Sequence, residues 1–287
     1  MVNATGVWVD ELRQQDGQAM GKPVRPMVAP SQGVHIVVDR DFLPSDHALL
    51  VPKTADGRVL FAVPWLGKLI LGTTDSPRKD LAREPLAFKE EVDFILGESA
   101  KYLRRAPGAQ DVRSIWVGLR PLVKPQDEEG GNTKAISREH TVLASKSGLV
   151  TVTGGKWTTY RAMAEAVLQN CFDAGLLPAQ PPHQRICDAQ GLHSYGSEAA
   201  AVRQLPGAEQ WLAEGLSEAM VRFAARFEYA RTVEDMLARR SRMLFLDARL
   251  AAELAPRVAA ILQEELGRDP RLAEFLALAQ QYQQLPT

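Results

Sequence analysis

The sequence predicts an α+β fold: a mostly antiparallel sheet domain that binds substrate and is packed with helices, followed by an all-α domain. Three observations predict it. Short β-rich runs separated by turn residues fill the first part of the chain, two amphipathic stretches interrupt them, and Ala, Leu, Arg and Glu dominate after residue 182. A chain of 287 residues suggests about two domains of roughly 150 residues each. Because the composition changes near residues 178–182, we place the domains at residues 1–180 and 181–287.

Five runs rich in β-branched and apolar residues read as strands of one sheet. Turn residues join neighbouring runs, with Asp56-Gly57 between two of them and Leu66-Gly67 between the next pair. Such short turns favour hairpins and therefore antiparallel pairing. The runs are residues 34–38, 48–51, 59–63, 68–71 and 149–152.

Helical periodicity predicts the remaining elements. Residues 88–105 and 158–174 carry apolar side chains at near-helical spacing, so both helices should pack on the sheet. The second half has a helical apolar stripe over residues 246–262, which indicates a bundle. Its last helix should begin after Asp269-Pro270, where an N-cap residue and a proline at the first helical position coincide.

Composition and charge exclude several classes of protein. The 34 basic and 35 acidic side chains give a net charge of -1, which argues against a nucleic-acid partner. Cys171 and Cys187 have neither CxxC nor His spacing, so we expect no disulfide framework, no metal site and a reducing, cytoplasmic compartment. The start of the chain lacks the pattern of a secretory signal, and no apolar run reaches the roughly 20 residues of a membrane span.

The most informative stretch runs from a β-branched strand through Gly154, Gly155 and Lys156 into an amphipathic helix that begins with Trp157 and Thr158. Two glycines let a ligand approach the backbone, and the N–H groups of a helix start attract an anion. A plain strand-to-helix turn is the alternative. The stretch is not a Walker loop, because Val150 stands where that motif needs glycine.

Two arginines lie inside apolar, β-like segments and need an anionic partner. Arg120 and Arg138 could each bind an acidic small molecule with the planar fork of the guanidinium, or could form a structural ion pair. Together with Lys156 they would specify a phosphate. His35 is a candidate acid or base, although a lone histidine in a strand is more often a core residue.

At these residues the sequence resembles the FAD-dependent glycerol-3-phosphate dehydrogenases, over essentially the whole chain. The most specific stretches are Gly-Gly-Lys-Trp-Thr-Thr-Tyr-Arg at 154–161 and Ala-Arg-Arg-Ser-Arg at 238–242. Other stretches with the same resemblance are residues 3–6, 31–35, 63–65, 71–75, 118–122 and 136–138.

The resemblance implies oxidation of sn-glycerol 3-phosphate to dihydroxyacetone phosphate, with electrons passing through FAD to quinone. Arg120 would face the reacting hydroxyl group as the catalytic residue. The phosphate would meet Arg138 and Lys156, and His35 would also bind substrate. The residues that would bind the cofactor are Asn3, Thr5, Gly6, Gly154, Gly155, Lys156, Trp157 and Thr158. The resemblance also implies peripheral attachment to the inner face of the cytoplasmic membrane, and it leaves a homo-oligomer open.

One feature departs from the family: the chain lacks the GxGxxG motif that cradles the FAD pyrophosphate. It therefore resembles the C-terminal portion of a longer enzyme, and we expect the isolated chain to bind FAD weakly or not at all and to lack dehydrogenase activity. Two alternatives stay open. One is a related flavin-dependent amine or carboxylate oxidase, and the other is a non-catalytic, truncated interaction module.

Overall fold

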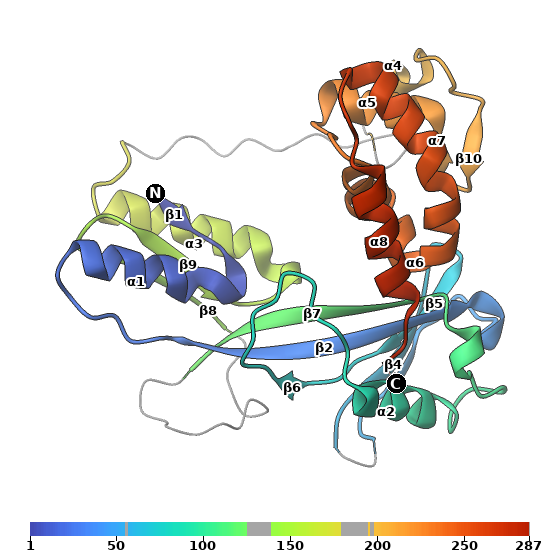
Figure 1. Ribbon diagram of the computed structural model, residues 1–287. Helices are drawn as coiled ribbons and strands as arrows, with labels where there is room; N and C mark the ends of the chain where they lie inside the picture. Colours follow the sequence, from blue (N-terminus) through green and yellow to red (C-terminus); the bar gives the residue numbers. More distant parts are fainter. Residues whose placement is uncertain (55–56, 125–138, 179–194, 196–197, 287) are drawn as a thin grey trace. The chain divides into compact units, whose positions relative to one another are not determined.

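The computed structural model describes residues 1–54, 57–124, 139–178, 195 and 198–286 (Figure 1). The chain divides into two compact units and passes between them several times. Unit 1 comprises Met1–Val34, Thr73–Leu86 and Val117–His183, and unit 2 comprises His35–Gly72, Ala87–Trp116 and Gln184–Thr287. The predicted domain boundary at residues 180 and 181 lies outside the described residues and stays a prediction.

Unit 1 contains a three-stranded sheet in the order β1 (Val2–Asn3), β9 (Val150–Gly154), β8 (His140–Ala144). β8 and β9 are antiparallel, whereas β1 runs parallel to β9. The helix α3 (Tyr160–Asp173) packs on β8 and β9, and α1 (Val9–Ala19) contacts β9. The predicted strand at 149–152 and helix at 158–174 are confirmed, but the strand lies in this three-stranded sheet and not in one sheet with the other four predicted runs. The 3-10 turns of this region are η1 (Gly6–Trp8) and η5 (Trp157–Thr159).

Unit 1 also holds the first half of the long strand β2 (Val28–Asp39). There Ser31 and Gln32 pair antiparallel with the short strand β6 (Ser76–Pro77). The strand β7 (Ser114–Val123) pairs with β2 as well, and beyond their ends Lys124 N donates to Met27 O at 2.8 Å. These pairings bring β6 and β7 together on β2.

Unit 2 contains the hairpin strands that the sequence predicts. β3 (Leu49–Val51), β4 (Leu60–Trp65) and β5 (Lys68–Gly72) pair antiparallel in that order, and β5 pairs with the second half of β2. Leu66 (φ 47°) and Gly67 (φ 76°) make the β4–β5 turn with two positive φ angles, as tight hairpins require. The antiparallel expectation is confirmed here.

The helix α2 (Lys89–Ser99) packs on β4 and β5, as expected, but is shorter than the predicted 88–105. Lys101 N and Tyr102 N donate to carbonyls three residues back, so the chain tightens out of the α-helix there. The short 3-10 turns of the sheet region are η2 (Arg40–Phe42) and η3 (Ala109–Asp111).

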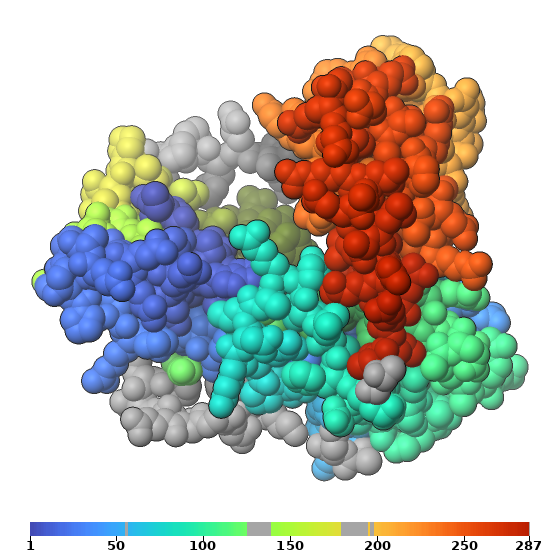
Figure 2. All heavy atoms as spheres, in the orientation of Figure 1, coloured from blue at the N-terminus to red at the C-terminus, as the bar shows by residue number. Residues whose placement is uncertain are grey.

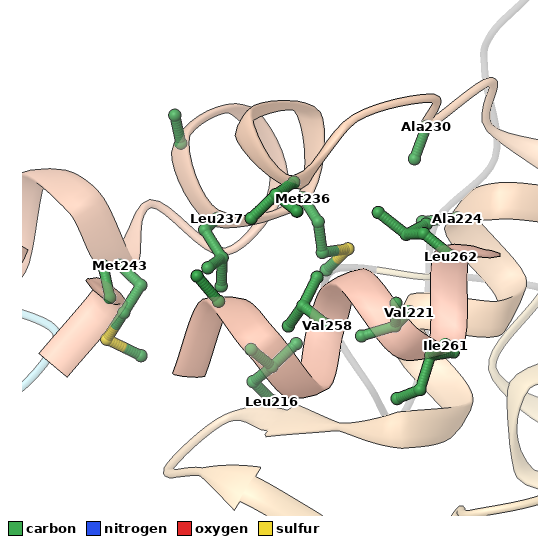
Figure 3. Packing of buried hydrophobic residues seen from close by; sticks show 14 of the residues in the cluster. Leu216, Val221, Ala224, Ala230, Met236, Leu237, Met243, Val258, Ile261 and Leu262 are labelled. Carbon is green, nitrogen blue, oxygen red and sulfur yellow. The ribbon is translucent and has the colours of Figure 1, made fainter. Parts of the chain in front are cut away.

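The rest of unit 2 is a helical bundle, as predicted, with one added hairpin of β10 (Trp211–Ala213) and β11 (Leu216–Ser217). α7 (Ala248–Leu266) and α8 (Leu272–Gln283) pack against each other, and Figure 2 shows the atoms of this red end of the chain in continuous contact. In the buried cluster of Figure 3, Val258, Ile261 and Leu262 of α7 gather with Val221 and Ala224 of α5 (Glu218–Phe227). The helices are α4 (Ala199–Arg203), α5 (Glu218–Phe227), the π-helix η7 (Asp235–Arg240), α6 (Met243–Leu246), α7 (Ala248–Leu266) and α8 (Leu272–Gln283).

The last helix begins after Asp269-Pro270, as expected, but Pro270 is not its first residue. α8 begins at Leu272, because Arg271 takes a left-handed φ of 58° and donates its N–H to Asp269 Oδ1. The carbonyl of Pro270 accepts from Val233 N at 2.9 Å and so serves a loop contact instead of the helix. Among the described residues, no helix combines the length and apolar character that crossing a bilayer requires.

An ion-pair network joins α5 to α7 in the bundle. Glu265 accepts from Arg226 Nε at 2.6 Å and from Arg222 Nη1 at 2.7 Å, while Arg222 Nη2 donates to Glu264 at 2.9 Å. The side chains of Arg222 and Glu265 are buried. Arg226 lowers the pKa of Glu265 from 4.5; burial opposes this shift and Arg222 adds to it.

We expect Glu265→Gln to lower the free energy of unfolding at pH 7 by about 2 kcal/mol, since a buried charge-assisted contact is lost. A carboxyl whose pKa falls on folding stabilises the protein above its unfolded pKa and loses that effect as the pH drops through the folded value. The difference from wild type should therefore shrink below pH 4.5. Urea unfolding at pH 7 and at pH 3 measures it. Glu253→Gln, in the exposed pair with Arg249 on the same helix, is the control and should change little. An equal loss at both pH values would contradict this account.

Candidate functional site

A pocket of about 260 Å³ opens in unit 1 between β7 and the turn that follows β9. It brings together two segments that the sequence analysis singled out separately: Arg120 with its neighbours and the Gly-Gly-Lys turn. The lining residues are Leu119, Arg120, Pro121, Leu122, Gly154, Gly155 and Lys156. Two cationic side chains and a polar backbone turn in one hollow favour an anionic ligand.

The backbone angles of the turn and the atoms close to it both favour glycine at positions 154 and 155. Gly154 and Gly155 have φ angles of 78° and 72°, in the left-handed region where other residues are strained. A Cβ at Gly154 would lie 2.6 Å from the carbonyl oxygen of Glu139, and one at Gly155 would lie 2.5 Å from Met163 Sδ. The glycines thus let the turn fold back tightly on β8 and α3, a reason that the sequence analysis did not foresee.

After the turn the chain enters η5 and α3. Thr159 caps this start: its N and Oγ1 both donate to Lys156 O at 3.0 Å, and Lys156 N approaches Thr159 Oγ1 at 3.4 Å. The first N–H groups of a helix have no partner within it, and they carry a partial positive charge. Trp157 and Thr158 contribute such groups next to the exposed Lys156. This arrangement can hold an anion or the electron-rich edge of a ring.

Beside the turn lies a pair of exposed aromatic rings. Trp157 is 85% exposed and Tyr160 is 60% exposed, and their rings stack at a centroid distance of 5.4 Å. Rings of this size are usually buried, so an exposed stack offers a flat apolar face to a planar ligand.

Arg120 reaches the neighbouring strand ends of unit 1. Its Nη2 donates to Thr73 Oγ1 at 3.1 Å, and its Nη1 lies 3.7 Å from Asp75 Oδ1. A Cβ at Gly33 would lie 2.6 Å from Arg120 Cζ, so the guanidinium crosses β2 where there is no side chain. Arg120 therefore fits both interpretations made from the sequence. It forms an ion pair with Asp75, and it also lines the pocket.

The N-terminal residues form a small polar cluster. Asn3 is buried, its Nδ2 donates to Val9 O at 2.9 Å, and its Oδ1 accepts from Thr5 Oγ1 at 2.8 Å. Gly6 follows with a φ of 64° and open space around the position of a Cβ. Asn3 thus orders the Thr5–Gly6 loop.

His35 belongs to unit 2. Its ring stacks on Trp116 at 4.1 Å, tilts against Phe61 at 5.7 Å, and sits over Gly72, where a Cβ would lie 2.6 Å from His35 Cδ2. Its role in substrate binding stays a prediction. Arg138 lies outside the described residues, as does Cys187. The pocket thus unites Arg120, Gly154, Gly155 and Lys156 among the predicted residues.

The sequence predicts no role for the residues around Arg120, although residues 31–35 and 71–75 carry part of the resemblance. Ser31 and Gly33 lie in β2, and Thr73 and Asp75 lie between β5 and β6, so these residues meet only in the folded chain. The run of small and hydroxyl residues in Leu71-Gly-Thr-Thr-Asp75 was the available signal, and it also suits an ordinary turn. Within the part of the chain that the structure describes, no three His, Cys, Asp or Glu side chains are placed to hold a metal ion.

Two family models match the chain. Residues 1–161 match FAD dependent oxidoreductase, and residues 150–272 match the C-terminal domain of alpha-glycerophosphate oxidase. The glycine turn and α3 begin where the two matches overlap.

Curated relatives and one solved structure agree with these matches. The chain is 31% identical to the mitochondrial glycerol-3-phosphate dehydrogenase of Schizosaccharomyces pombe, over 96% of this chain and 53% of that protein. It is 36% identical to the Bos taurus enzyme of the same name, over 94% of this chain and 41% of that protein. The glycerol-3-phosphate dehydrogenase from Bacillus halodurans, solved with FAD, superposes with a TM-score of 0.69 at 26% identity, over 99% of this chain and 62% of that one. The chain spans about half the length of the curated relatives it matches.

Proposed function

Since the chain belongs to the FAD dependent oxidoreductase family, we propose that it forms the substrate-binding and C-terminal helical parts of a glycerol-3-phosphate dehydrogenase. The reaction is the oxidation of sn-glycerol 3-phosphate to dihydroxyacetone phosphate. The observation that carries the proposal is the pocket that unites Arg120 with Gly154, Gly155 and Lys156. The match of residues 150–272 to the C-terminal domain of alpha-glycerophosphate oxidase supports the choice of substrate.

The phosphate group is proposed to bind at Lys156, whose ammonium group supplies a full positive charge. Arg138 is proposed as a third cation on the basis of its sequence motif alone. A carboxylate substrate would need fewer positive groups than this, so the set favours a phosphate ester over the alternative amine or carboxylate substrate.

Arg120 is proposed to meet the hydroxyl group on C2 of the substrate. When that hydroxyl loses its proton, negative charge develops on the oxygen, and a guanidinium fixed beforehand stabilises it. Fixation is what the contacts of Arg120 with Thr73 and Asp75 provide. Arg120 therefore binds and orients the reacting end, while Lys156 binds the phosphate end.

The residues of this chain fit the flavin end of FAD. The N–H groups at the start of α3 and the backbone of Gly6 can approach a ring edge, and Trp157 offers a flat face. When bound, FAD supplies the acceptor for the hydride from the substrate. The proposed contacts are Asn3, Thr5 and Gly6 in the N-terminal loop and Gly154, Gly155, Lys156, Trp157 and Thr158 in the turn.

Electron delivery to a quinone is proposed on the strength of the family resemblance. Quinones dissolve in lipid, so the enzyme would lie at the periphery of a membrane, on the cytoplasmic side. The absence of a spanning helix among the described residues is compatible with that position.

Isothermal titration of the purified chain with glycerol 3-phosphate, and separately with glycine, tests the proposed substrate class. We expect saturable binding of glycerol 3-phosphate and none of glycine. Lys156→Gln should weaken glycerol 3-phosphate binding about tenfold, the size expected for one charge-assisted contact. Lys146→Gln, which changes an exposed lysine of the same unit, should leave it unchanged. Binding of glycine in preference, or no binding of glycerol 3-phosphate, would contradict the proposal.

A visible spectrum of the chain with added FAD addresses the cofactor separately. We expect no bound flavin with the chain alone. Bound flavin that bleaches on anaerobic addition of glycerol 3-phosphate would overturn that expectation and would strengthen the proposed function.

A further inference from the structure

We propose that Asp75 and Ser31 are positioning residues that hold the guanidinium of Arg120 in the orientation in which it meets the substrate. Gly33 has no side chain, so it leaves room for the guanidinium to reach Asp75. This inference deepens the function proposed above and rests on it. Nothing in the sequence motifs or in the comparisons assigns a role to these three residues.

The side chain of Arg120 reaches its partners by crossing a neighbouring strand. Arg120 starts on β7 and crosses β2 at Gly33, where a Cβ would lie 2.6 Å from Cζ. Beyond that strand its Nη atoms meet Thr73 Oγ1 at 3.1 Å and Asp75 Oδ1 at 3.7 Å. Any side chain at position 33 would block this route, so Gly33 is a condition for the observed orientation.

The carboxylate of Asp75 is itself held by the hydroxyl group of Ser31. Ser31 Oγ donates to Asp75 Oδ1, the same oxygen that faces Arg120 Nη1. Ser31 is fully buried in β2, and the side chain of Asp75 is only 13% exposed. The hydroxyl group thereby fixes the rotamer of Asp75, and the carboxylate in turn fixes and partly neutralises the guanidinium. Such neutralisation offsets the cost of holding an arginine that is itself only 24% exposed.

The residues proposed to position Arg120 are not among those that line the pocket. Arg120 lines the pocket, whereas Ser31, Gly33, Thr73 and Asp75 do not. We therefore expect Asp75 and Ser31 to influence a ligand in that pocket by way of Arg120. A double-mutant cycle detects this dependence, because two residues that act through one contact do not have additive effects.

The experiment measures binding of two probes, glycerol 3-phosphate and inorganic phosphate, to the full chain by isothermal titration. Glycerol 3-phosphate has the hydroxyl group that Arg120 would meet, and inorganic phosphate lacks it. Asp75→Asn should weaken glycerol 3-phosphate binding about tenfold and phosphate binding less than about twofold. Ser31→Ala should act in the same direction with a smaller effect. In an Arg120→Lys background, Asp75→Asn should add less than about a further twofold.

If Asp75 only stabilised the fold, Asp75→Asn would weaken binding of both probes to the same extent. Equal weakening of both probes, or a full tenfold effect of Asp75→Asn in the Arg120→Lys background, would overturn the inference. Asp46→Asn is the matched control, since it breaks an exposed arginine–aspartate pair with Arg40 in unit 2 and should alter neither affinity.

A second readout needs no ligand and keeps the inference separate from the proposed function. In NMR spectra, a held guanidinium shows slow rotation of its Nη groups, and the Arg120 signals are assigned by their loss in Arg120→Lys. Asp75→Asn and Ser31→Ala should speed that rotation, whereas Asp46→Asn should not. Unchanged Arg120 signals in both variants would overturn the inference. A wild-type chain that binds neither probe would instead count against the proposed function, and the NMR result would still decide the positioning role.

Discussion

Replacement of Gly154 by alanine is expected to destabilise unit 1 by about 3 kcal/mol and to abolish binding of glycerol 3-phosphate. Two effects add. A left-handed φ of 78° costs a non-glycine residue about 1 kcal/mol. The new methyl carbon would also lie 2.6 Å from the carbonyl oxygen of Glu139, a backbone atom directly before the strand β8. Relief of this clash shifts the turn that carries Lys156.

Gly175→Ala is the matched control for Gly154→Ala. Gly175 lies in the same unit with a φ of 67° and has no atom within 4 Å of the position of a Cβ. It should therefore show only the conformational cost, about 1 kcal/mol. Urea unfolding followed by tryptophan fluorescence measures both variants, and titration calorimetry measures the ligand. Equal destabilisation by the two substitutions would show that the approach of Gly154 to β8 contributes nothing.

Arg120→Ala is expected to weaken binding of glycerol 3-phosphate on the order of 100-fold, since it removes the charged donors to the reacting end of the substrate. The loss should be greater than for Lys156→Gln, because the alanine variant also leaves the largely buried carboxylate of Asp75 without the guanidinium.

Arg120→Lys separates charge from geometry. A lysine keeps the positive charge next to Asp75 but lacks the planar fork, so it should recover stability while recovering only part of the affinity. Titration calorimetry together with thermal unfolding of both variants tests this. If Arg120→Lys bound the substrate as well as wild type, a positioned guanidinium would not be required.

The sequence predicts the elements whose signals are local. The hairpin of β4 and β5 follows from Leu66-Gly67 between two apolar runs, and α3 follows from the spacing of Met163, Val167 and Cys171. Element ends are less predictable. α8 begins after Asp269-Pro270, as expected, but its first residue is Leu272 and not Pro270, because Val233, from a distant loop, donates to the carbonyl of Pro270.

The candidate site is predictable only in part, for the same reason. The Gly-Gly-Lys turn and Arg120 stand out as residue types that are unusual in their surroundings, and the structure places them in one pocket. The partners of Arg120 do not stand out, because serine, threonine and aspartate are common at strand ends. Ser31 and Asp75 meet through pairing of β2 with β6, and no local pattern specifies that pairing. The parallel pairing of β1 with β9 escapes sequence reasoning likewise, since it joins opposite ends of unit 1.

The burial of Cys171 between β9 and α3 gives unit 1 a reporter of its own opening rate. The thiol is 5% exposed and packs with Val150, Val152 and Val167. A thiol reagent can reach it when α3 or its last turn opens away from the sheet, so the rate of labelling measures how often this opening occurs. With Cys187 replaced by serine, the time course would come from this single sulfur. The lifetime of the closed helix could then be followed in seconds or hours, with no added probe and no denaturant.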